Sequence, residues 1–311
     1  MTATRRPSSA SATSSTAEGR VVAAHGRHYE VELADGRRLK CFPRGKKALA
    51  TVGDRVRISL QGADEGAIEQ VLERSNLLYR SDDMRSKQFA ANVDLLLLVV
   101  ATEPAFSDDL TGRALVAAGS AGIDAVVILN KADLAAGLDA ARARLAGLAA
   151  LGVPVLELSA LDHAQVREKL LPLMHGRTSL LLGQSGMGKS TLLNALVPEA
   201  QAATQAHSQA LGTGKHTTTS TRMYRVPEAD ADLIDSPGFQ AFGLYHLSAH
   251  EIEQGFPEFR QAIQYCRYYN CTHRHEPGCG VLAALQRGEI SPERHALYQR
   301  ILAENEAKNR Y

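Results

Sequence analysis

The octapeptide GQSGMGKS at residues 183–190 constrains this chain more than any other feature. It follows a short apolar run at 179–182 and opens a helical pattern of leucines at 192, 193 and 196. In this motif, G-x-x-x-x-G-K-S, the backbone N–H groups of a glycine-rich loop and the start of a helix surround a phosphate chain. A chance glycine-rich turn would not combine the strand, the spacing, the Lys-Ser pair and the helix. The motif therefore predicts binding of a nucleoside triphosphate.

The positions of this loop have distinct predicted roles. Lys189 reaches the terminal phosphates, and the hydroxyl of Ser190 is a ligand for Mg2+. The predicted nucleotide contacts in and after the loop are Gly183, Gln184, Ser185, Gly186, Met187, Gly188, Lys189, Ser190 and Thr191.

The tetrapeptide Asn130-Lys131-Ala132-Asp133 is the N-K-x-D signature for guanine, and it ends a short apolar, β-branched run that predicts a buried strand. The Asp133 carboxylate can accept hydrogen bonds from N1–H and the exocyclic amine of guanine, whereas adenine presents a reversed edge. Lys131 would lie along the base, and Asn130 would brace the neighbouring loops. Alone, the tetrapeptide fits an ordinary helix start with an exposed Asp133 equally well. Together with the phosphate loop it favours guanine.

Two further loops are predicted to complete the nucleotide site. The backbone N–H groups of Ser159 and Ala160 would touch the guanine oxygen. In the D-x-x-G pattern at 235–238, the Asp235 carboxylate would hold Mg2+ through water, and the N–H of Gly238 would contact the γ-phosphate. A polar loop with three threonines, at 217–219, would supply a switch threonine, and the three are equal candidates.

The order of these motifs is circularly permuted, because the guanine motifs precede the phosphate loop. Permutation leaves each motif at the carboxyl end of a parallel strand, where open α/β sheets bind ligands. With this order, the patterns GxSGxGKS, GxGKHTTT and DSPGF make the chain resemble the RsgA (YjeQ) family, the ribosome small subunit-dependent GTPases of bacteria and some organelles. The resemblance covers nearly the whole chain after residue 18.

The resemblance implies a partner and a process. It implies a GTPase that binds the small ribosomal subunit and its rRNA, hydrolyses GTP to GDP and phosphate during late maturation of that subunit, and is stimulated by it. The residues alone predict only a GTPase linked to RNA.

The N-terminal part predicts a small β-barrel. Five short alternating runs predict strands, and an OB-fold is the best candidate. The runs lie at 21–23, 29–33, 39–42, 55–58 and 67–71. Residues 1–60 hold 12 Lys and Arg against 5 Asp and Glu, while the remaining 251 residues hold 23 against 29.

The basic charge of this part is densest in one cluster on and after a hairpin. Its members are Arg37, Arg38, Lys40, Arg44, Lys46 and Lys47. Fold and charge together favour binding of an RNA backbone, and a solvated basic face without a partner is the alternative. Aromatic side chains are sparse here, with Tyr29 and Phe42, so contact with the backbone is expected rather than reading of bases.

Near the C-terminus, three cysteines and a histidine lie within 14 residues, with the spacing Cys266-x4-Cys271-x-His273-x5-Cys279. Three thiolates and an imidazole satisfy Zn2+ completely, so the pattern predicts one structural zinc site. Three clustered cysteines cannot all pair, which disfavours a disulfide framework. His275 is the competing ligand, and the family pattern favours His273.

Hydrolysis is predicted to be slow without a partner. Phe239 stands where ordinary small GTPases have the glutamine that orients the attacking water, and Gln240 is a weak substitute. His216, in the switch segment, is the predicted catalytic residue together with Lys189. The alternative for His216 is a histidine on a surface loop.

The expected architecture is multidomain. Its parts are a disordered tail at 1–18, an all-β OB barrel at 19–74, a circularly permuted α/β P-loop GTPase domain at 80–242 and a mostly helical zinc-binding domain at 243–311. A transit peptide is the alternative for the tail. No apolar run reaches 18 residues, so no membrane span is predicted. The chain is expected to be cytoplasmic and monomeric when free.

Two other functions fit parts of the sequence. One is an RNA-binding module that guanine nucleotide switches, with incidental hydrolysis. The other is a P-loop ATPase or kinase in which N-K-x-D is coincidental.

Overall fold

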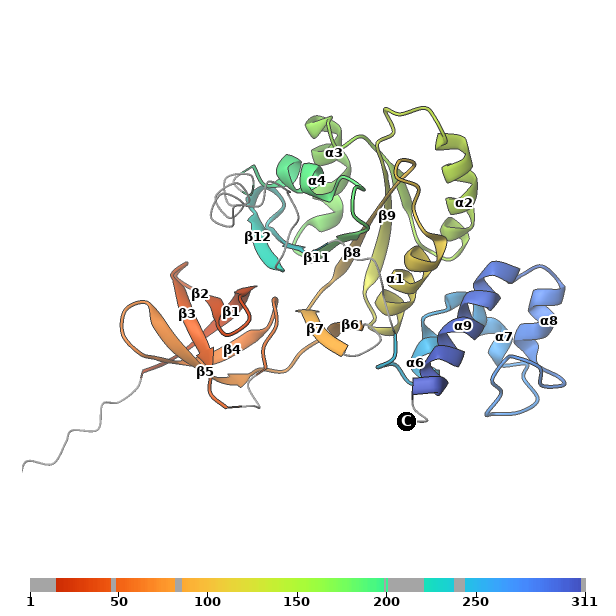
Figure 1. The fold of residues 1–311 in the computed structure, drawn as a ribbon, viewed down its shortest axis with the longest axis horizontal. Coiled ribbons are helices and arrows are strands. Elements are labelled where there is room, and N and C mark those ends of the chain that lie inside the picture. Colours follow the sequence, from red (N-terminus) through yellow and green to blue (C-terminus); the bar gives the residue numbers. More distant parts are fainter. Residues whose placement is uncertain are drawn as a thin grey trace, which may run out of the picture.

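A computed structural model describes residues 15–45, 49–81, 86–198, 200, 221–237 and 244–308. Three parts follow one another along the chain, and Figure 1 shows them side by side: a β-barrel, a central sheet flanked by helices, and a group of helices at the C-terminal end. None of the helices within these ranges is both long and apolar enough to cross a membrane.

The N-terminal part is a closed barrel of five strands. Its strands are β1 (Thr16–Ala24), β2 (Tyr29–Leu33), β3 (Arg38–Pro43), β4 (Arg55–Leu60) and β5 (Glu65–Val71). The order is β1-β2-β3-β5-β4, and β4 pairs again with β1, which closes the barrel. Alternate residues such as Val31, Leu39 and Ile58 fill its interior. The five predicted strands and the OB-type barrel are confirmed.

The barrel begins earlier than the sequence suggests. Residues 16–18 were expected to belong to the disordered tail, but they form the start of β1 and pair with Arg57, Ile58 and Ser59 of β4. Their polar composition is typical of disorder, yet main-chain pairing with β4 overrides that preference because it closes the barrel. The expected tail is therefore wrong for residues 16–18, and residues 1–14 lie outside the described ranges.

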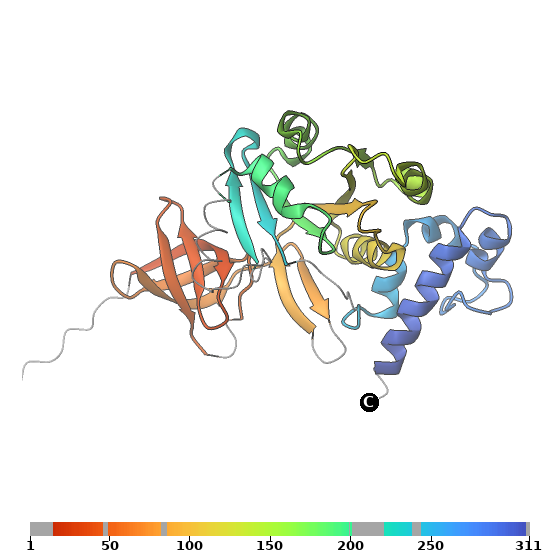
Figure 2. The same cartoon turned by 45° about the horizontal axis from the view of Figure 1, so that its top comes forward.

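A hairpin follows the barrel and forms a sheet of its own. Its strands are β6 (Leu77–Ser81) and β7 (Ser86–Ala91), and Figure 2 shows it between the barrel and the C-terminal helices. The nucleotide domain was expected to start at residue 80, within this hairpin. In the structure the first strand of the central sheet starts at Leu95, so the hairpin is a separate element.

The central sheet carries the predicted nucleotide motifs. Its strands are β8 (Leu95–Ala101), β9 (Asp124–Asn130), β10 (Val155–Glu157), β11 (Thr178–Gly183), β12 (Arg222–Val226) and β13 (Ala231–Asp235). They lie in the order β10-β9-β8-β11-β13-β12, and all neighbours are parallel except β12 and β13. All seven residues of β8 are buried, as expected for a central parallel strand. The carboxyl ends of β9, β10, β11 and β13 meet at one edge, which is where this class of sheet binds ligands.

Within the described residues, four helices connect these strands: α1 (Asp108–Ser120), α2 (Leu138–Ala150), α3 (His163–Met174) and α4 (Lys189–Leu196). Ser107 caps the N-terminus of α1, where its Oγ accepts a hydrogen bond from the N–H of Leu110, and Asp162 caps α3 in the same way. A short 3-10 turn, η1 (Pro227–Ala229), joins β12 to β13.

The C-terminal part is helical. It contains α6 (Ala249–Gln254), the 3-10 turn η2 (Pro257–Phe259), α7 (Arg260–Ile263), α8 (Gly280–Gln286) and α9 (Pro292–Lys308). The mostly helical character that the sequence predicts for this part is confirmed. Phe256, Phe259 and Tyr298 are fully buried in the core of this part. The two phenyl rings stack, and the Tyr298 ring meets both of them edge-on.

Buried charge and close packing fix the helical part against α1. Arg113, only 7% exposed, donates both of its terminal nitrogens to the carboxylate of Glu304 on α9. A Cβ added to Gly112 would lie 2.4 Å from Leu297, so α1 and α9 meet where a side chain has no room.

The barrel and the central sheet are continuous. Ala23 of β1 pairs with Arg222 of β12, and Arg20 donates to Asp232 at 2.5 Å and to Thr178 Oγ1 at 2.7 Å. These contacts hold the barrel beside β12, the strand that follows residues 201–220.

Candidate functional site

The predicted phosphate loop adopts the expected strand, loop and helix. β11 ends at Gly183 and α4 begins at Lys189. The Lys189 side chain is 9% exposed, and its Nζ donates to the carbonyl oxygens of Gly183 at 2.6 Å and Gln184 at 3.0 Å. The ammonium group therefore binds the carbonyl groups of its own loop and is already shielded from water. A bound phosphate would replace these two carbonyl groups as its partner.

Burial lowers the pKa of Lys189, and the nearby Asp235 carboxylate opposes that shift. Asp235 is 2% exposed at the end of β13, and it pairs in register with Leu181 of β11. Ser236, next to it, donates its hydroxyl to the Leu181 carbonyl oxygen. The predicted phosphate-binding lysine and the predicted Mg2+ carboxylate are thus buried neighbours.

Asn130 connects the guanine loop to the phosphate loop. Its Nδ2 donates to the carbonyl oxygen of Met187 at 2.8 Å, and its Oδ1 accepts from the N–H of Ala160 at 2.8 Å. The side chain is 1% exposed. One buried amide therefore ties together three loops that are far apart in sequence, as the N-K-x-D motif predicts.

Position 188, which contacts Asn130, accommodates only glycine. Its φ is +90°, and an added Cβ would lie 2.3 Å from Asn130 Nδ2. Both the left-handed backbone and the lack of space require glycine at the start of α4.

The two other predicted guanine contacts differ in their surroundings. Asp133 is exposed in the turn that follows β9, while Lys131 has a φ of +62° and donates from Nζ to the carbonyl oxygen of Glu103 at 2.6 Å. Ala132 donates its N–H to the carbonyl oxygen of Leu158. These bonds fix the turn after β9. Because β9 and β11 run parallel in one sheet, this turn lies at the same edge of the sheet as Lys189.

The N–H groups of Ser159 and Ala160 already have partners within the protein. Ser159 N–H donates to Gln165 Oε1 at 3.0 Å, and Ala160 N–H donates to Asn130 Oδ1. A guanine oxygen would have to share or replace these acceptors, which the sequence did not indicate.

Several predicted residues lie outside the described ranges: His216, the three threonines at 217–219, Gly238, Phe239, Gln240, Lys46 and Lys47. Ser190 is described and exposed, at the first turn of α4, and Thr191 follows it.

The segment at 102–107, which no sequence motif singles out, follows β8 and contacts the phosphate loop. The N–H of Ser107 donates to Gln184 Oε1 at 2.8 Å, and a Cβ at Gly186 would lie 3.1 Å from Pro104. The signal was present, because the apolar run at 95–101 is followed by Ser107 and two acids, a typical helix start. We conclude that this segment supports one side of the loop.

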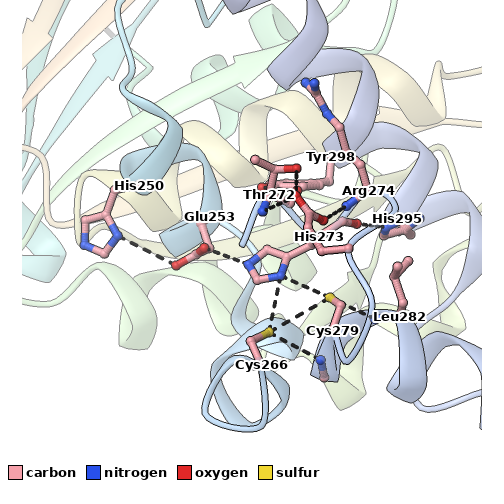
Figure 3. A network of polar contacts seen from close by, with 12 residues as sticks. His250, Glu253, Cys266, Thr272, His273, Arg274, Cys279, Leu282, His295 and Tyr298 are labelled. Carbon is pink, nitrogen blue, oxygen red and sulfur yellow. Dashed lines mark hydrogen bonds and ion pairs between the residues drawn. The ribbon is translucent and has the colours of Figure 1, made fainter. Parts of the chain in front are cut away.

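The predicted metal ligands form a second site in the helical part. Cys266, Cys271, His273 and Cys279 offer ligand atoms that all lie within 4.8 Å of one another. Nδ1 of His273 faces the sulfurs, 3.6 Å from Cys266 and 3.4 Å from Cys279, as Figure 3 shows. His275 is exposed and does not belong to the cluster, so His273 is the histidine that lies with the three cysteines.

The surroundings of the cluster suit thiolate ligands. Backbone N–H groups point at two of the sulfurs, from Gly280 to Cys266 at 3.3 Å and from Leu282 to Cys279 at 3.4 Å. Burial raises the pKa of the Cys271 thiol to about 12 and also raises that of Cys279. A bound cation would reverse this preference, because metal coordination deprotonates thiols. The donor set therefore fits a soft divalent metal ion.

The basic cluster of the barrel is partly neutralised by its neighbours. Arg37 pairs with Asp35, Arg38 with Glu32, and Arg44 with Glu69. Lys40 is exposed and lies over the ring of Phe42, 5.3 Å from its centroid. Tyr29, by contrast, is 9% exposed inside the barrel and cannot serve as an aromatic surface.

Comparison with known proteins identifies a family. A model of the RsgA GTPase family matches residues 71–245. The small ribosomal subunit biogenesis GTPase RsgA of Bordetella pertussis is 69% identical over 298 residues, which are 96% of this chain and 99% of that protein. The protein of the same name from Burkholderia pseudomallei is 57% identical over 292 residues, 93% of this chain and 92% of its own length.

Two solved structures share the whole fold. YjeQ from Thermotoga maritima superposes with a TM-score of 0.70 at 30% identity and covers 93% of this chain and 98% of its own. YloQ, described as a circularly permuted GTPase, has a TM-score of 0.70 at 25% identity and covers 97% and 99%.

Proposed function

The chain belongs to the RsgA family of GTPases, and from this premise we propose that it hydrolyses GTP to GDP and phosphate while bound to the small ribosomal subunit. The proposed process is late maturation of that subunit, with turnover stimulated by it. The observation that carries the proposal is the Asn130 side chain, which joins the guanine loop to the phosphate loop through its bonds to Ala160 and Met187.

The proposed nucleotide contacts follow from this geometry. Asp133 would accept from the guanine edge, and the loop at 183–190 would surround the phosphates. Ser190 and Asp235 would hold Mg2+, which supplies positive charge at the β- and γ-phosphates. Lys189 would exchange its bonds to the carbonyl groups of Gly183 and Gln184 for bonds to phosphate oxygens. Because Lys189 is already buried, little further desolvation accompanies this exchange.

The proposed catalytic residues are Lys189 and His216. Lys189 would stabilise charge that develops on the transferred phosphoryl group. His216 would orient or deprotonate the attacking water once the switch segment is ordered by a partner. Phe239 cannot take that role, since a phenyl ring neither donates nor accepts a strong hydrogen bond.

For the metal cluster we propose one structural Zn2+, held by three thiolates and Nδ1 of His273. Four such ligands leave no position for substrate, so the ion would hold the loop at 266–279 together. For the barrel we propose contact with the rRNA backbone, supported by exposed Lys40 and by the basic composition of this part. We also propose that the protein is cytoplasmic and that it is monomeric when free. Light scattering would check the monomeric state.

GTP turnover by the purified protein, titrated with small ribosomal subunits, tests the proposal. We expect low turnover alone and a large rise with small subunits, since completion of a GTPase site in trans can be worth as much as ~10^5-fold. Large subunits serve as the control, and a Lys189→Ala protein measures contaminating activity. Turnover that ignores the small subunit would favour an RNA-binding module for which hydrolysis is incidental. Tighter binding of ADP than of GDP would instead indicate an ATPase.

A further inference from the structure

The two ring nitrogens of His273 have different partners. Nδ1 faces the sulfurs of Cys266 and Cys279, while Nε2 lies 2.9 Å from Oε2 of Glu253 on α6 (Figure 3). The imidazole is 1% exposed, so water cannot replace either partner freely. An imidazole that binds a metal through Nδ1 carries its proton on Nε2, and this proton needs an acceptor. The Glu253 carboxylate is in place to be that acceptor.

The rest of the loop fixes where His273 lies but not which nitrogen carries the proton. Its backbone has a φ of +58°, and its carbonyl oxygen accepts a hydrogen bond from Nε2 of His295 at 2.8 Å. Its ring lies against the rings of Phe259 and Tyr298. These contacts are apolar or involve the main chain. Apart from the sulfurs at Nδ1, the polar group that faces the ring is therefore Glu253 at Nε2.

We propose that Glu253 is the positioning residue of the metal site: it accepts the Nε2 proton of His273, holds Nδ1 free for the metal, and thereby ties α6 to the metal loop. This inference rests on the proposed zinc site. Carboxylate partners of this kind orient a metal-bound histidine and raise its basicity, and their loss typically weakens metal binding 10- to 100-fold.

The location of Glu253 gives the contact a second effect. Among the described elements, α6 is the first helix after the D-x-x-G segment, and it packs on α1 and on α9. Glu253 lies in the last turn of α6 and links this helix to the metal loop through His273. The other polar neighbour of Glu253 is His250, which is on the same helix and 72% exposed, so it does not connect α6 to another element. Metal binding and the docking of α6 are therefore linked, since each favours the same position of the Glu253 carboxylate.

The full-length protein provides the test. A chromogenic chelator measures zinc release from the loaded protein. NMR of 15N-labelled histidine reports the tautomer of His273 in the zinc-free protein, because zinc bound at Nδ1 would by itself place the proton on Nε2. Glu253→Ala should release zinc 10- to 100-fold more readily. Without zinc, its His273 should lose the pure Nε2–H signature that the unmodified protein keeps. Glu253→Gln keeps an oxygen that can accept the proton, so it should restore the tautomer and most of the zinc retention.

Two control variants separate positioning from general loss of helix stability. Ser248→Ala removes the cap of α6, where Ser248 and Glu251 bond each other reciprocally, and leaves the His273 contact intact. His250→Ala removes the exposed neighbour of Glu253. Both should retain zinc nearly as the unmodified protein does.

Unchanged zinc release in Glu253→Ala would overturn the inference, and so would an equal loss in Ser248→Ala. If the unmodified protein binds no zinc, both the proposed metal site and the role of Glu253 are overturned. Because these measurements involve no nucleotide, they are independent of the GTPase proposal.

Discussion

Asn130 donates its side-chain amide to the carbonyl oxygen of Met187, 57 positions further along the chain, at 2.8 Å. The loop that is proposed to read the base thus holds the loop that is proposed to bind the phosphates. Since both hydrogen bonds of Asn130 are buried, the two halves of the nucleotide site have a fixed separation before any ligand binds.

Asn130→Ala should weaken GDP binding roughly 10- to 100-fold, because two buried hydrogen bonds of about 0.5–1.5 kcal/mol each are lost. Asn130→Asp should weaken it as well, since a carboxylate can accept from Ala160 but cannot donate to Met187. Titration with a fluorescent GDP analogue measures both variants. Affinity equal to that of the unmodified protein in Asn130→Ala would show that the two loops do not depend on this link.

Gly188→Ala should cost more stability than Gly122→Ala. Both glycines have positive φ, +90° and +67°, but an added Cβ meets Asn130 at position 188 and open space at position 122. We expect Gly122→Ala to cost about 1–2 kcal/mol from its backbone alone. Chemical unfolding gives the difference between the two variants, which isolates the contact with Asn130. Equal costs would mean that Asn130 moves aside freely.

Asp133→Asn should lower guanine affinity and raise xanthine affinity. The loss should be on the order of 100-fold, because a charge-assisted hydrogen bond contributes about 1.5–3 kcal/mol. Competition between GDP and xanthosine diphosphate is the measurement. Asp139→Asn, another exposed acid beyond the same loop, is the control and should keep the original preference for guanine.

Arg113→Met should loosen the helical part from α1. Arg113 is 7% exposed and joins Glu304 and Asp109, whereas Arg300 makes an exposed pair with Asp109 alone. We expect a loss of several kcal/mol for Arg113→Met, as for other broken buried pairs, and less than about 1 kcal/mol for Arg300→Met. Thermal unfolding and limited proteolysis between the two parts would detect the difference. Similar effects of the two variants would argue against a role of burial.

The same contact predicts a dependence on pH. Burial alone would raise the pKa of Asp109, but the hydrogen bonds from Arg113 and Arg300 outweigh it and hold the pKa below its usual value. A depressed carboxyl pKa stabilises the fold above the unfolded value, near 4, and this contribution disappears as the pH falls through the folded value. Asp109→Asn should therefore destabilise the protein at pH 7, and its difference from the unmodified protein should shrink below about pH 4. Unfolding midpoints of both proteins over this range provide the check. A difference that is constant with pH would contradict it.

Much of the proposed nucleotide site at the carboxyl ends of the strands could be predicted, because each motif combines a strand with residues whose chemistry allows few other roles. Asn130 is an example, since N-K-x-D after a buried strand already implies a bracing amide. The burial of Tyr29 could also have been predicted, because it alternates with Val31 and Leu33 on one face of β2.

Other features depend on contacts that no local pattern records. Thr16 begins a strand because Ser59 of β4 is its partner, not because of its own neighbours in sequence. Glu253 lies 20 positions before His273, on a helix that reads as ordinary and polar, and only the folded chain brings them together. The fully apolar strand at 95–101 lacks the alternation that identifies half-buried strands, so periodicity does not separate it from a buried helix.

The permuted strand order also affects synthesis. β8 and β9 leave the ribosome before β11, which occupies the other side of β8 in the finished sheet. Until residues 178–183 emerge, a fully apolar strand has one unpaired side, and nascent segments of this type are prone to misassembly. We therefore expect a translating chain paused before residue 178 to need chaperone protection that a chain paused after β13 no longer requires.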